Sequence, residues 1–185
     1  MKRIVDYSQM FIKDYIKDGD IVVDFTMGNG YDTLFLANAT PHGRVYSFDI
    51  VPQALMNTKA KLEEANINNV ELILDGHEHA YKYVDHFKVG IFNFGYLPQG
   101  DKQITTLLDT SKLAVEKALK ILEKKGLLLL VLYPGHDEGK RESDYFSSFI
   151  RSLDIYYYDC FTFKMENREN CPYIIGIEKK RENKK

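Results

Sequence analysis

The sequence predicts an open, doubly wound α/β sheet of seven strands, mostly parallel, with a C-terminal antiparallel hairpin. Short apolar runs rich in β-formers alternate with stretches of helical periodicity, a pattern typical of parallel βα units. The last two apolar runs follow each other too closely to leave room for a crossover helix, so they should pair antiparallel. A length of 185 residues fits a single domain spanning residues 1–185. Sheets of this class bind ligands at the carboxyl ends of their strands.

The individual elements are predicted from apolar spacing and from turn residues. Strands are predicted where short β-branched or aromatic runs occur, at 21–25, 44–49, 70–75, 89–94, 127–133, 155–163 and 173–178. Helices are predicted where apolar residues recur three and four positions apart, at 7–16, 31–39, 52–65, 104–122 and 143–152, with a short helix before 89. The turn sequences DGD, PHG and NINN separate elements, and Pro52 suits a first helical turn. Gly126 is expected just past the end of the helix at 104–122.

Composition and charge exclude several classes of protein. Hydrophobic residues make up 44% of the chain and charged residues 28%, which is typical of a soluble globular protein. The longest apolar run, 127–133, is far shorter than the ~20 residues that span a bilayer, so no membrane partner is expected. The N-terminus lacks a signal-peptide pattern, which favours a cytoplasmic location. The net charge of −2 gives no overall basic field, so a nucleic acid would need local patches, which a homodimer could merge.

A glycine-containing turn, TMGNGYDT, follows the first predicted strand. Gly28 and Gly30 would let the backbone turn sharply and approach a ligand, although an ordinary strand-to-helix turn can use the same residues. Thr33 stands where a dinucleotide fingerprint has its third glycine, which disfavours a nicotinamide-dependent oxidoreductase. Asp49 ends the second strand, where an acid can accept hydrogen bonds from both hydroxyls of a ribose. A glycine loop without a pyrophosphate cradle, together with this acid, points to S-adenosylmethionine.

Four blocks of sequence resemble those of a bacterial family of class I methyltransferases. The blocks are DFTMGNGYDT, FNFGYLPQGDK, YPGH and PYIIGIEK, and the resemblance covers nearly the whole chain. Members were long labelled rRNA methylases and are now assigned to methylation of 5-aminomethyl-2-thiouridine at the tRNA wobble position. The resemblance implies a Rossmann-like class I fold, S-adenosyl-L-methionine as the cofactor, and the anticodon region of tRNA as the partner. Substrate-side departures leave rRNA or a small amine as alternatives: Gln99, Asp137, Glu138 and Cys171.

The resemblance also implies roles for single residues in binding the cofactor. Asn29 and Asp32 are similar to the positions that hold its methionine moiety. Asp49 would bind the ribose. Gly76 and His77, which follow the third strand, would border the adenine.

Polar residues after the fourth and fifth strands are candidates for the chemistry. Methyl transfer is an in-line displacement, so the protein has to align the acceptor and leave it an unprotonated lone pair. An alkyl amine titrates about 3 units above neutral pH, and its deprotonation therefore costs roughly 4 kcal/mol. Asn93 in NFGY resembles the asparagine of the Asn-Pro-Pro-Tyr block of amino-group methyltransferases, and its oxygen would accept a hydrogen from the amine. Tyr96, in the same block, would stack on a base.

Other candidates carry weaker signals. His136, after a Pro-Gly turn, and Asp101 are candidates for accepting the proton, and Tyr133 at the rim would contact the nucleotide. The structural alternatives are strand-end caps and exposed turn residues. The HEH sequence at 77–79 lacks a matched set of ligands, so no metal is expected. A non-catalytic domain that binds cofactor or RNA is the alternative from another class, and NFGYLPQGD beside the expected methyl group disfavours it.

Overall fold

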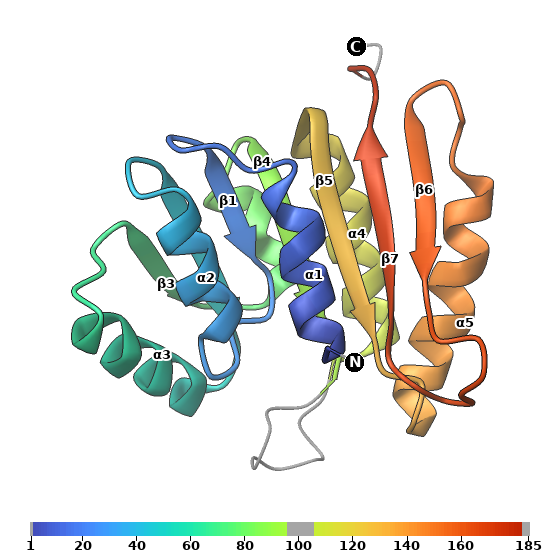
Figure 1. The fold of residues 1–185 in the computed structure, drawn as a ribbon, viewed down its shortest axis with the longest axis horizontal. Helices are drawn as coiled ribbons and strands as arrows, with labels where there is room; N and C mark the ends of the chain where they lie inside the picture. Colours follow the sequence, from blue (N-terminus) through green and yellow to red (C-terminus); the bar gives the residue numbers. More distant parts are fainter. Residues whose placement is uncertain (1, 96–105, 183–185) are drawn as a thin grey trace.

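The computed structural model describes residues 2–95 and 106–182, and it contains one seven-stranded sheet in the order β3-β2-β1-β4-β5-β7-β6 (Figure 1). Neighbours from β3 through β5 pair in parallel, whereas β7 is antiparallel to both β5 and β6. The strands are β1 Ile21–Asp24, β2 Arg44–Asp49, β3 Val70–Leu74, β4 Phe87–Asn93, β5 Leu122–Leu132, β6 Tyr158–Phe163 and β7 Tyr173–Lys179. This topology confirms the predicted fold class.

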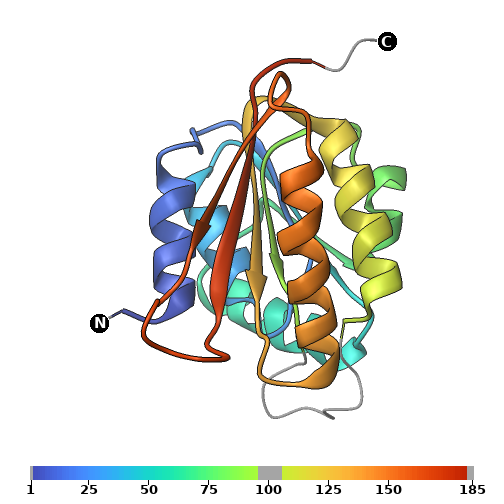
Figure 2. The ribbon, with the colours of Figure 1, turned by 90° about the vertical axis from the view of Figure 1, so that its right-hand side faces the viewer.

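Helices cover both faces of the sheet, as the view along its plane shows (Figure 2). The helices are α1 Ile4–Lys13, α2 Tyr31–Ala39, α3 Pro52–Glu64, the 3-10 helix η1 His77–Lys82, α4 Leu108–Ile121 and α5 Asp137–Ser152. One buried cluster joins the sheet to α1 and α2, and a second joins its other face to η1, α4 and α5. Within the two described ranges, no helix has both the length and the apolarity that a membrane span requires.

The group that caps the end of α4 differs from the prediction. The helix ends at Ile121 and the chain enters β5 at the next residue, so Gly126 lies inside the strand and not just past the helix. The carbonyl groups at the helix end are satisfied by Lys179 of β7, whose Nζ donates to Leu122 O over 2.7 Å. The Lys179 side chain, from a strand far along the sequence, therefore caps this helix end in place of the predicted Gly126.

Two other elements, α5 and β6, begin at residues that differ from the prediction, in each case because of local hydrogen bonds. The helix predicted at 143–152 begins at Asp137, because His136 caps its first turn by accepting the Gly139 N–H through Nδ1. The strand predicted at 155–163 begins at Tyr158, because the Tyr157 and Tyr158 N–H groups donate to Asp154 O in a turn.

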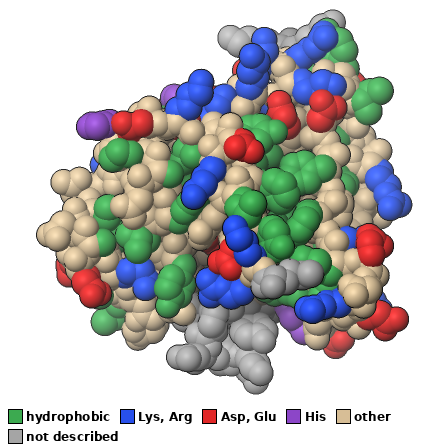
Figure 3. Space-filling model, viewed as in Figure 1, with side chains coloured by type: hydrophobic (Ala, Val, Ile, Leu, Met, Phe, Trp, Pro, Cys, Tyr) green, Lys and Arg blue, Asp and Glu red, His purple; other side chains and the backbone are tan. Residues whose placement is uncertain are grey.

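An aromatic cluster joins the C-terminal hairpin to the first helix. The Phe163 ring of β6 lies 4.7 Å from the Tyr7 ring of α1, and the Phe161 ring lies 5.0 Å from the Phe11 ring, measured between centroids. Figure 3 shows hydrophobic side chains gathered on this face beside α1, toward β7 and β6. The hairpin aromatics therefore pack on α1, which ties the N-terminal helix to the sheet beside the candidate site.

Candidate functional site

A cavity of about 1270 Å³ lies among the segments that follow the parallel strands. Its walls come from the segments after β1, β2, β3, β4 and β5, from α1 and α2, and from the segment just before β7. Nine predicted site residues line it: Gly28, Asn29, Asp32, Asp49, Gly76, His77, Asn93, Tyr133 and His136. Tyr96 and Asp101 lie outside the described residues. The residues that were predicted because they follow strand ends therefore lie on one continuous surface.

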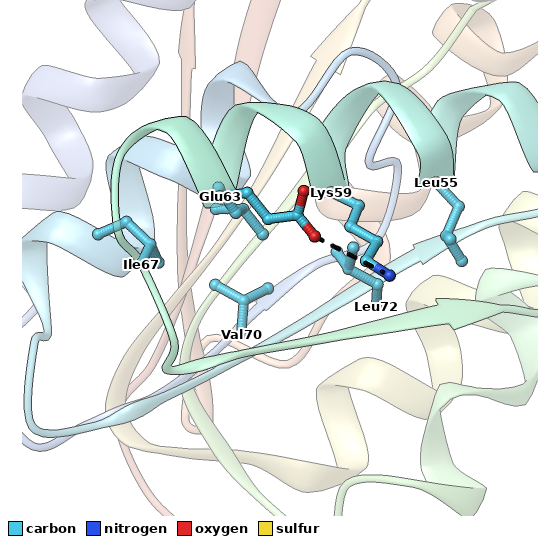
Figure 4. Close-up of a pocket in the computed structure, with 7 residues that line it drawn as sticks. Leu55, Lys59, Glu63, Ile67, Val70 and Leu72 are labelled. Atoms are coloured by element: carbon cyan, nitrogen blue, oxygen red, sulfur yellow. Dashed lines mark ion pairs between the residues drawn. The ribbon is translucent and has the colours of Figure 1, made fainter.

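A second, smaller hollow of about 410 Å³ lies between α3 and the edge strand β3 (Figure 4). Its walls are mainly apolar, and Lys59 and Glu63 of α3 form an ion pair over it, with 3.9 Å between Nζ and Oε1. None of the predicted site residues lines this hollow.

The glycine turn after β1 adopts a conformation that favours glycine. Gly28 and Gly30 have φ of 52° and 75°, in the left-handed region, and Gly30 is the N-cap of α2. A Cβ at Gly30 would lie 2.6 Å from the Thr58 hydroxyl oxygen. Gly28 lines the cavity, so its missing Cβ leaves room for a ligand, whereas Gly30 is required by the packing of α2 on α3.

Asp49 is fixed at the end of β2 by two backbone groups. Its Oδ2 accepts the Gly28 N–H and its Oδ1 accepts the Val51 N–H, each over 2.9 Å. Each carboxylate oxygen keeps a further lone pair for a ligand. The glycine turn and the acid are therefore parts of one rigid unit that can accept hydrogen bonds from two hydroxyl groups.

Asn29 and His77 occupy different parts of the cavity wall. The Asn29 Oδ1 accepts a hydrogen bond from Asn57 Nδ2 of α3 over 2.9 Å. The His77 ring packs edge-on against Phe92, with 5.5 Å between centroids. Burial lowers the pKa of His77, so the imidazole is neutral and presents a flat, weakly polar wall next to Gly76.

Asp32 lies at the centre of the polar part of the cavity. Its Oδ1 accepts a hydrogen bond from Gln9 Nε2 over 3.0 Å, and its Oδ2 accepts one from Asn93 Nδ2 over 2.7 Å. Burial raises the pKa of Asp32, and the two hydrogen bonds oppose that rise. The Asn93 backbone N–H donates to the Thr26 hydroxyl over 2.7 Å, which holds the end of β4 against the glycine turn.

Tyr133 and His136 close the cavity on the β5 side. Burial, and then the nearby charge of Asp32, raise the pKa of Tyr133 to about 12, so its hydroxyl stays protonated. The His136 Nδ1 accepts the Gly139 N–H over 3.1 Å, which places the proton of the neutral ring on Nε2. Neutral His136 is therefore a hydrogen-bond donor at Nε2.

A buried network joins the segment after β4 to α5. The Gly95 N–H donates to Thr106 Oγ1 over 2.9 Å, and that hydroxyl donates to Glu142 Oε2 over 3.0 Å. Ser111 Oγ donates to the other Glu142 oxygen over 2.6 Å. Burial raises the pKa of Glu142 to about 7. Sequence reasoning missed Glu142 because the helix was predicted to begin at residue 143, whereas α5 begins at Asp137 and includes Glu142.

A second buried carboxylate supports the glycine turn from below. Thr33 Oγ1 donates to Asp24 Oδ2 over 2.6 Å and lies 2.7 Å from Ser47 Oγ. Burial, and then the charge of Asp32, raise the pKa of Asp24 to about 7. The threonine at the third-glycine position thus links β1 to β2. Among the residues with described positions, no three His, Cys, Asp or Glu side chains gather into a group that could hold a metal ion.

Comparisons with known proteins agree with this geometry. Residues 45–178 match the family model described as "Putative rRNA methylase". A chloroplastic tRNA (mnm(5)s(2)U34)-methyltransferase from Arabidopsis thaliana is 33% identical over 97% of this chain and 70% of its own length.

Two solved structures of bacterial proteins are similar over almost their whole lengths. A "putative rRNA-methylase" from Clostridium thermocellum is 39% identical, with a TM-score of 0.93 over 97% of this chain and 98% of that one. A "putative methyltransferase" from Streptococcus mutans, in complex with SAH, is 36% identical, with a TM-score of 0.88 over 97% and 99%. The fixed ribose-type acid and the open glycine turn fit S-adenosylmethionine as the cofactor. The chain therefore belongs to the rRNA methylase family and is an S-adenosylmethionine-dependent methyltransferase.

Proposed function

We propose that this enzyme methylates the amino nitrogen of 5-aminomethyl-2-thiouridine at the wobble position of tRNA. The observation that carries the proposal is the state of the Asn93 side chain. Its Oδ1 is buried at the cavity and accepts no hydrogen bond from the described residues, while its Nδ2 is bound to Asp32. A buried acceptor without a donor is costly, so a ligand with an N–H group would stabilise it.

The charge of the cavity supports a cationic ligand. Its described lining includes five acidic side chains, from Asp6, Asp32, Asp49, Asp75 and Glu78, and one arginine, Arg3. Such a cavity favours a sulfonium and an ammonium group and disfavours a phosphate. An amine on a base that has left the anticodon stack fits this surface, with the RNA backbone kept outside.

The walls of the same cavity would also form the cofactor site. Gly28, Asn29 and Asp32 would hold the methionine part, Asp49 the ribose, and Gly76 and His77 the adenine. Gly30 acts here by shaping the turn. S-adenosylmethionine supplies an electrophilic methyl group when bound. Once the ammonium group has lost one proton to water, Asn93 would accept a hydrogen bond from the neutral amine and so turn its lone pair toward the methyl group.

Other residues would act on the substrate side. His136 was predicted to accept the proton. The Gly139 N–H occupies the lone pair on Nδ1 of the neutral ring, so we propose instead that His136 contacts the nucleotide as a donor through Nε2. Tyr133 would contact the nucleotide through its protonated hydroxyl. A base-stacking role for Tyr96 and a proton-accepting role for Asp101 stay predictions.

The rim of the cavity supports an RNA substrate. The Tyr31 side chain is 69% exposed there, and Lys61 Nζ lies 4.0 Å from the centre of its ring. An exposed aromatic ring next to a cation suits a stacked base and its phosphate. The Arabidopsis relative, named for a tRNA wobble uridine, gives further support. The homodimer stays a prediction, which sedimentation velocity at working concentration would test.

The experiment is single-turnover methyl transfer from labelled S-adenosylmethionine to total tRNA from a strain that lacks this gene. Nucleoside analysis should find the label on 5-aminomethyl-2-thiouridine. The Asn93→Ala variant should bind S-adenosylhomocysteine normally and lose at least roughly tenfold in rate, because it lacks the acceptor. Asn68→Ala, an exposed asparagine, is the matched control. Absence of label on tRNA, from an enzyme that binds S-adenosylhomocysteine, would overturn the proposed substrate. Full turnover by Asn93→Ala would remove the role of Asn93.

A further inference from the structure

Two side-chain amides share the Asp32 carboxylate, and both line the cavity. Gln9 comes from α1 and Asn93 from the end of β4, so they approach Asp32 from two different elements. Their NH₂ groups lie 3.0 and 2.7 Å from the two carboxylate oxygens. Asp32 itself is the second residue of α2 and is 8% exposed.

The carboxylate dictates which way both amides face. An ionised carboxylate only accepts hydrogen bonds, so each amide has to present its NH₂ group to Asp32. The oxygen of each amide is then held on the side away from Asp32. For Asn93 this oxygen is the buried acceptor at the cavity that the described residues leave without a hydrogen bond. An amide can donate or accept a hydrogen bond. Asp32 thus fixes the orientation of both amides so that each presents its oxygen as an acceptor.

We propose that Asp32, Gln9 and Asn93 form a site that binds a primary amine and limits the reaction to one methyl group. Gln9 and Asn93 accept one N–H each, and Asp32 orients them. This inference rests on the proposed function and adds the reason why the acceptor is a primary amine.

The chemistry of the two acceptors gives the selectivity. A primary amine in its neutral form has two N–H groups and one lone pair, so both amide oxygens are satisfied while the lone pair stays free. A secondary amine has a single N–H group, and its methyl group would face the second oxygen. That oxygen would be desolvated without a donor, which costs binding energy. The methylated product is therefore a poor substrate for a second transfer.

Gln9→Met tests the selectivity, because methionine has a similar length and neither donates nor accepts strongly. The probes are tRNA carrying 5-aminomethyl-2-thiouridine and tRNA carrying its monomethylated product. The ratio of kcat/KM for the first over the second should fall roughly tenfold in Gln9→Met. Binding of S-adenosylhomocysteine should be unchanged. Lys13→Met, an exposed residue on the same helix, should keep the wild-type ratio.

A charge-conserving exchange tests the orienting role of Asp32. Asp32→Asn alone frees the Asn93 amide to turn. Because Asp32 is also proposed to hold the methionine part of the cofactor, kcat is measured at saturating S-adenosylmethionine, where it should still fall by roughly tenfold or more. Adding Asn93→Asp restores these hydrogen bonds with the amide and the carboxylate exchanged. The amide introduced by Asp32→Asn accepts from Gln9 and donates to the carboxylate introduced by Asn93→Asp. The other oxygen of that carboxylate then faces the amine. The double variant should regain a large part of kcat.

The outcomes distinguish a failure of the proposed function from a failure of the primary-amine site alone. Failure of the wild-type enzyme to methylate the aminomethyl tRNA overturns the proposed function and this inference with it. A wild-type enzyme that methylates this tRNA, combined with an unchanged selectivity ratio in Gln9→Met, overturns the inference alone. A double variant that binds S-adenosylhomocysteine and is as slow as Asp32→Asn removes the orienting role.

Discussion

The Lys179 ammonium is 1% exposed and lies 2.7 Å from the carbonyl oxygen of Leu122, the first residue after α4. The carbonyl oxygens of Leu119 and Lys120 lie within 3.5 Å of the same nitrogen. A cation at this end of the helix compensates carbonyl groups that have no partner within the helix.

Lys179→Met should destabilise the fold, because these carbonyl groups would be buried without a donor. The expected loss is about 2 kcal/mol in the free energy of unfolding, which lowers Tm by roughly 4–8 °C in a protein of this size. Thermal unfolding measures the shift. Lys180→Met, the neighbouring and more exposed lysine, is the control, and equal shifts in both variants would refute the cap.

Thr33→Val should destabilise the glycine turn, because the buried Asp24 carboxylate loses the donor at 2.6 Å. We expect about 1–3 kcal/mol less stability from chemical denaturation, and Thr33→Ser should retain most of it because the hydroxyl remains. Equal stability of the valine and serine variants would contradict this reading of the threonine.

Glu142→Gln should change how stability depends on pH. The pKa of Glu142 is raised from 4.5 to about 7 in the folded protein, so the folded state binds more protons than the unfolded state between these values. Stability therefore falls as pH rises through this window. The variant should lose less stability from pH 4.5 to 7.5, with a gain of up to about 3 kcal/mol at pH 8. Glu116→Gln, an exposed acid on α4, should leave the slope unchanged, and an unchanged slope in Glu142→Gln would exclude Glu142 as its source.

Asp49→Asn should weaken cofactor binding. The amide cannot accept hydrogen bonds at both of its ends, so it loses one bond to Gly28 or Val51 and one acceptor for the ribose. Calorimetry with S-adenosylhomocysteine should give a Kd roughly 10–100-fold higher, in line with charged hydrogen bonds. Asp85→Asn, an exposed acid, serves for comparison. A wild-type Kd for the Asp49→Asn enzyme would show that Asp49 does not bind the ribose.

Tyr31→Ala should raise KM for tRNA and leave the affinity for S-adenosylhomocysteine unchanged, because Tyr31 lies at the rim. A stacked base contributes about 1–3 kcal/mol, which corresponds to roughly a 5–150-fold change. Tyr81 is a matched control, since its ring also has a lysine, Lys117, at 4.0 Å but does not line the cavity. Equal KM values for the two variants would rule out base stacking on Tyr31.

The sequence predicted best those elements whose signals are local. The helix at 31–39 and the strand at 44–49 were predicted with the observed bounds, because a glycine turn and a PHG turn delimit them. The cap predicted for α4, Gly126, was wrong because the group that satisfies this helix end, Lys179, lies 57 residues beyond Leu122 in the sequence. Periodicity carries no information about such a contact.

The site was predicted to the extent that it follows strand ends. Asp49 and Asn93 were found because parallel strands place their carboxyl ends along one edge. Gln9 was missed because it comes from a helix before the first strand, and only the packing of α1 on the sheet brings it to Asp32. Its weak signal was a polar residue next to buried Ser8 on an amphipathic helix.

The hydroxyl bridge from Thr33 to Asp24 and Ser47 also bears on how this loop could evolve. A change to glycine at position 33 would complete the spacing of a dinucleotide-binding loop, yet it would leave two buried polar groups without their shared partner. A path from this methyltransferase to a nicotinamide enzyme would therefore need changes on two strands at once. Thr33 would therefore oppose an exchange between two cofactor specificities that share one architecture.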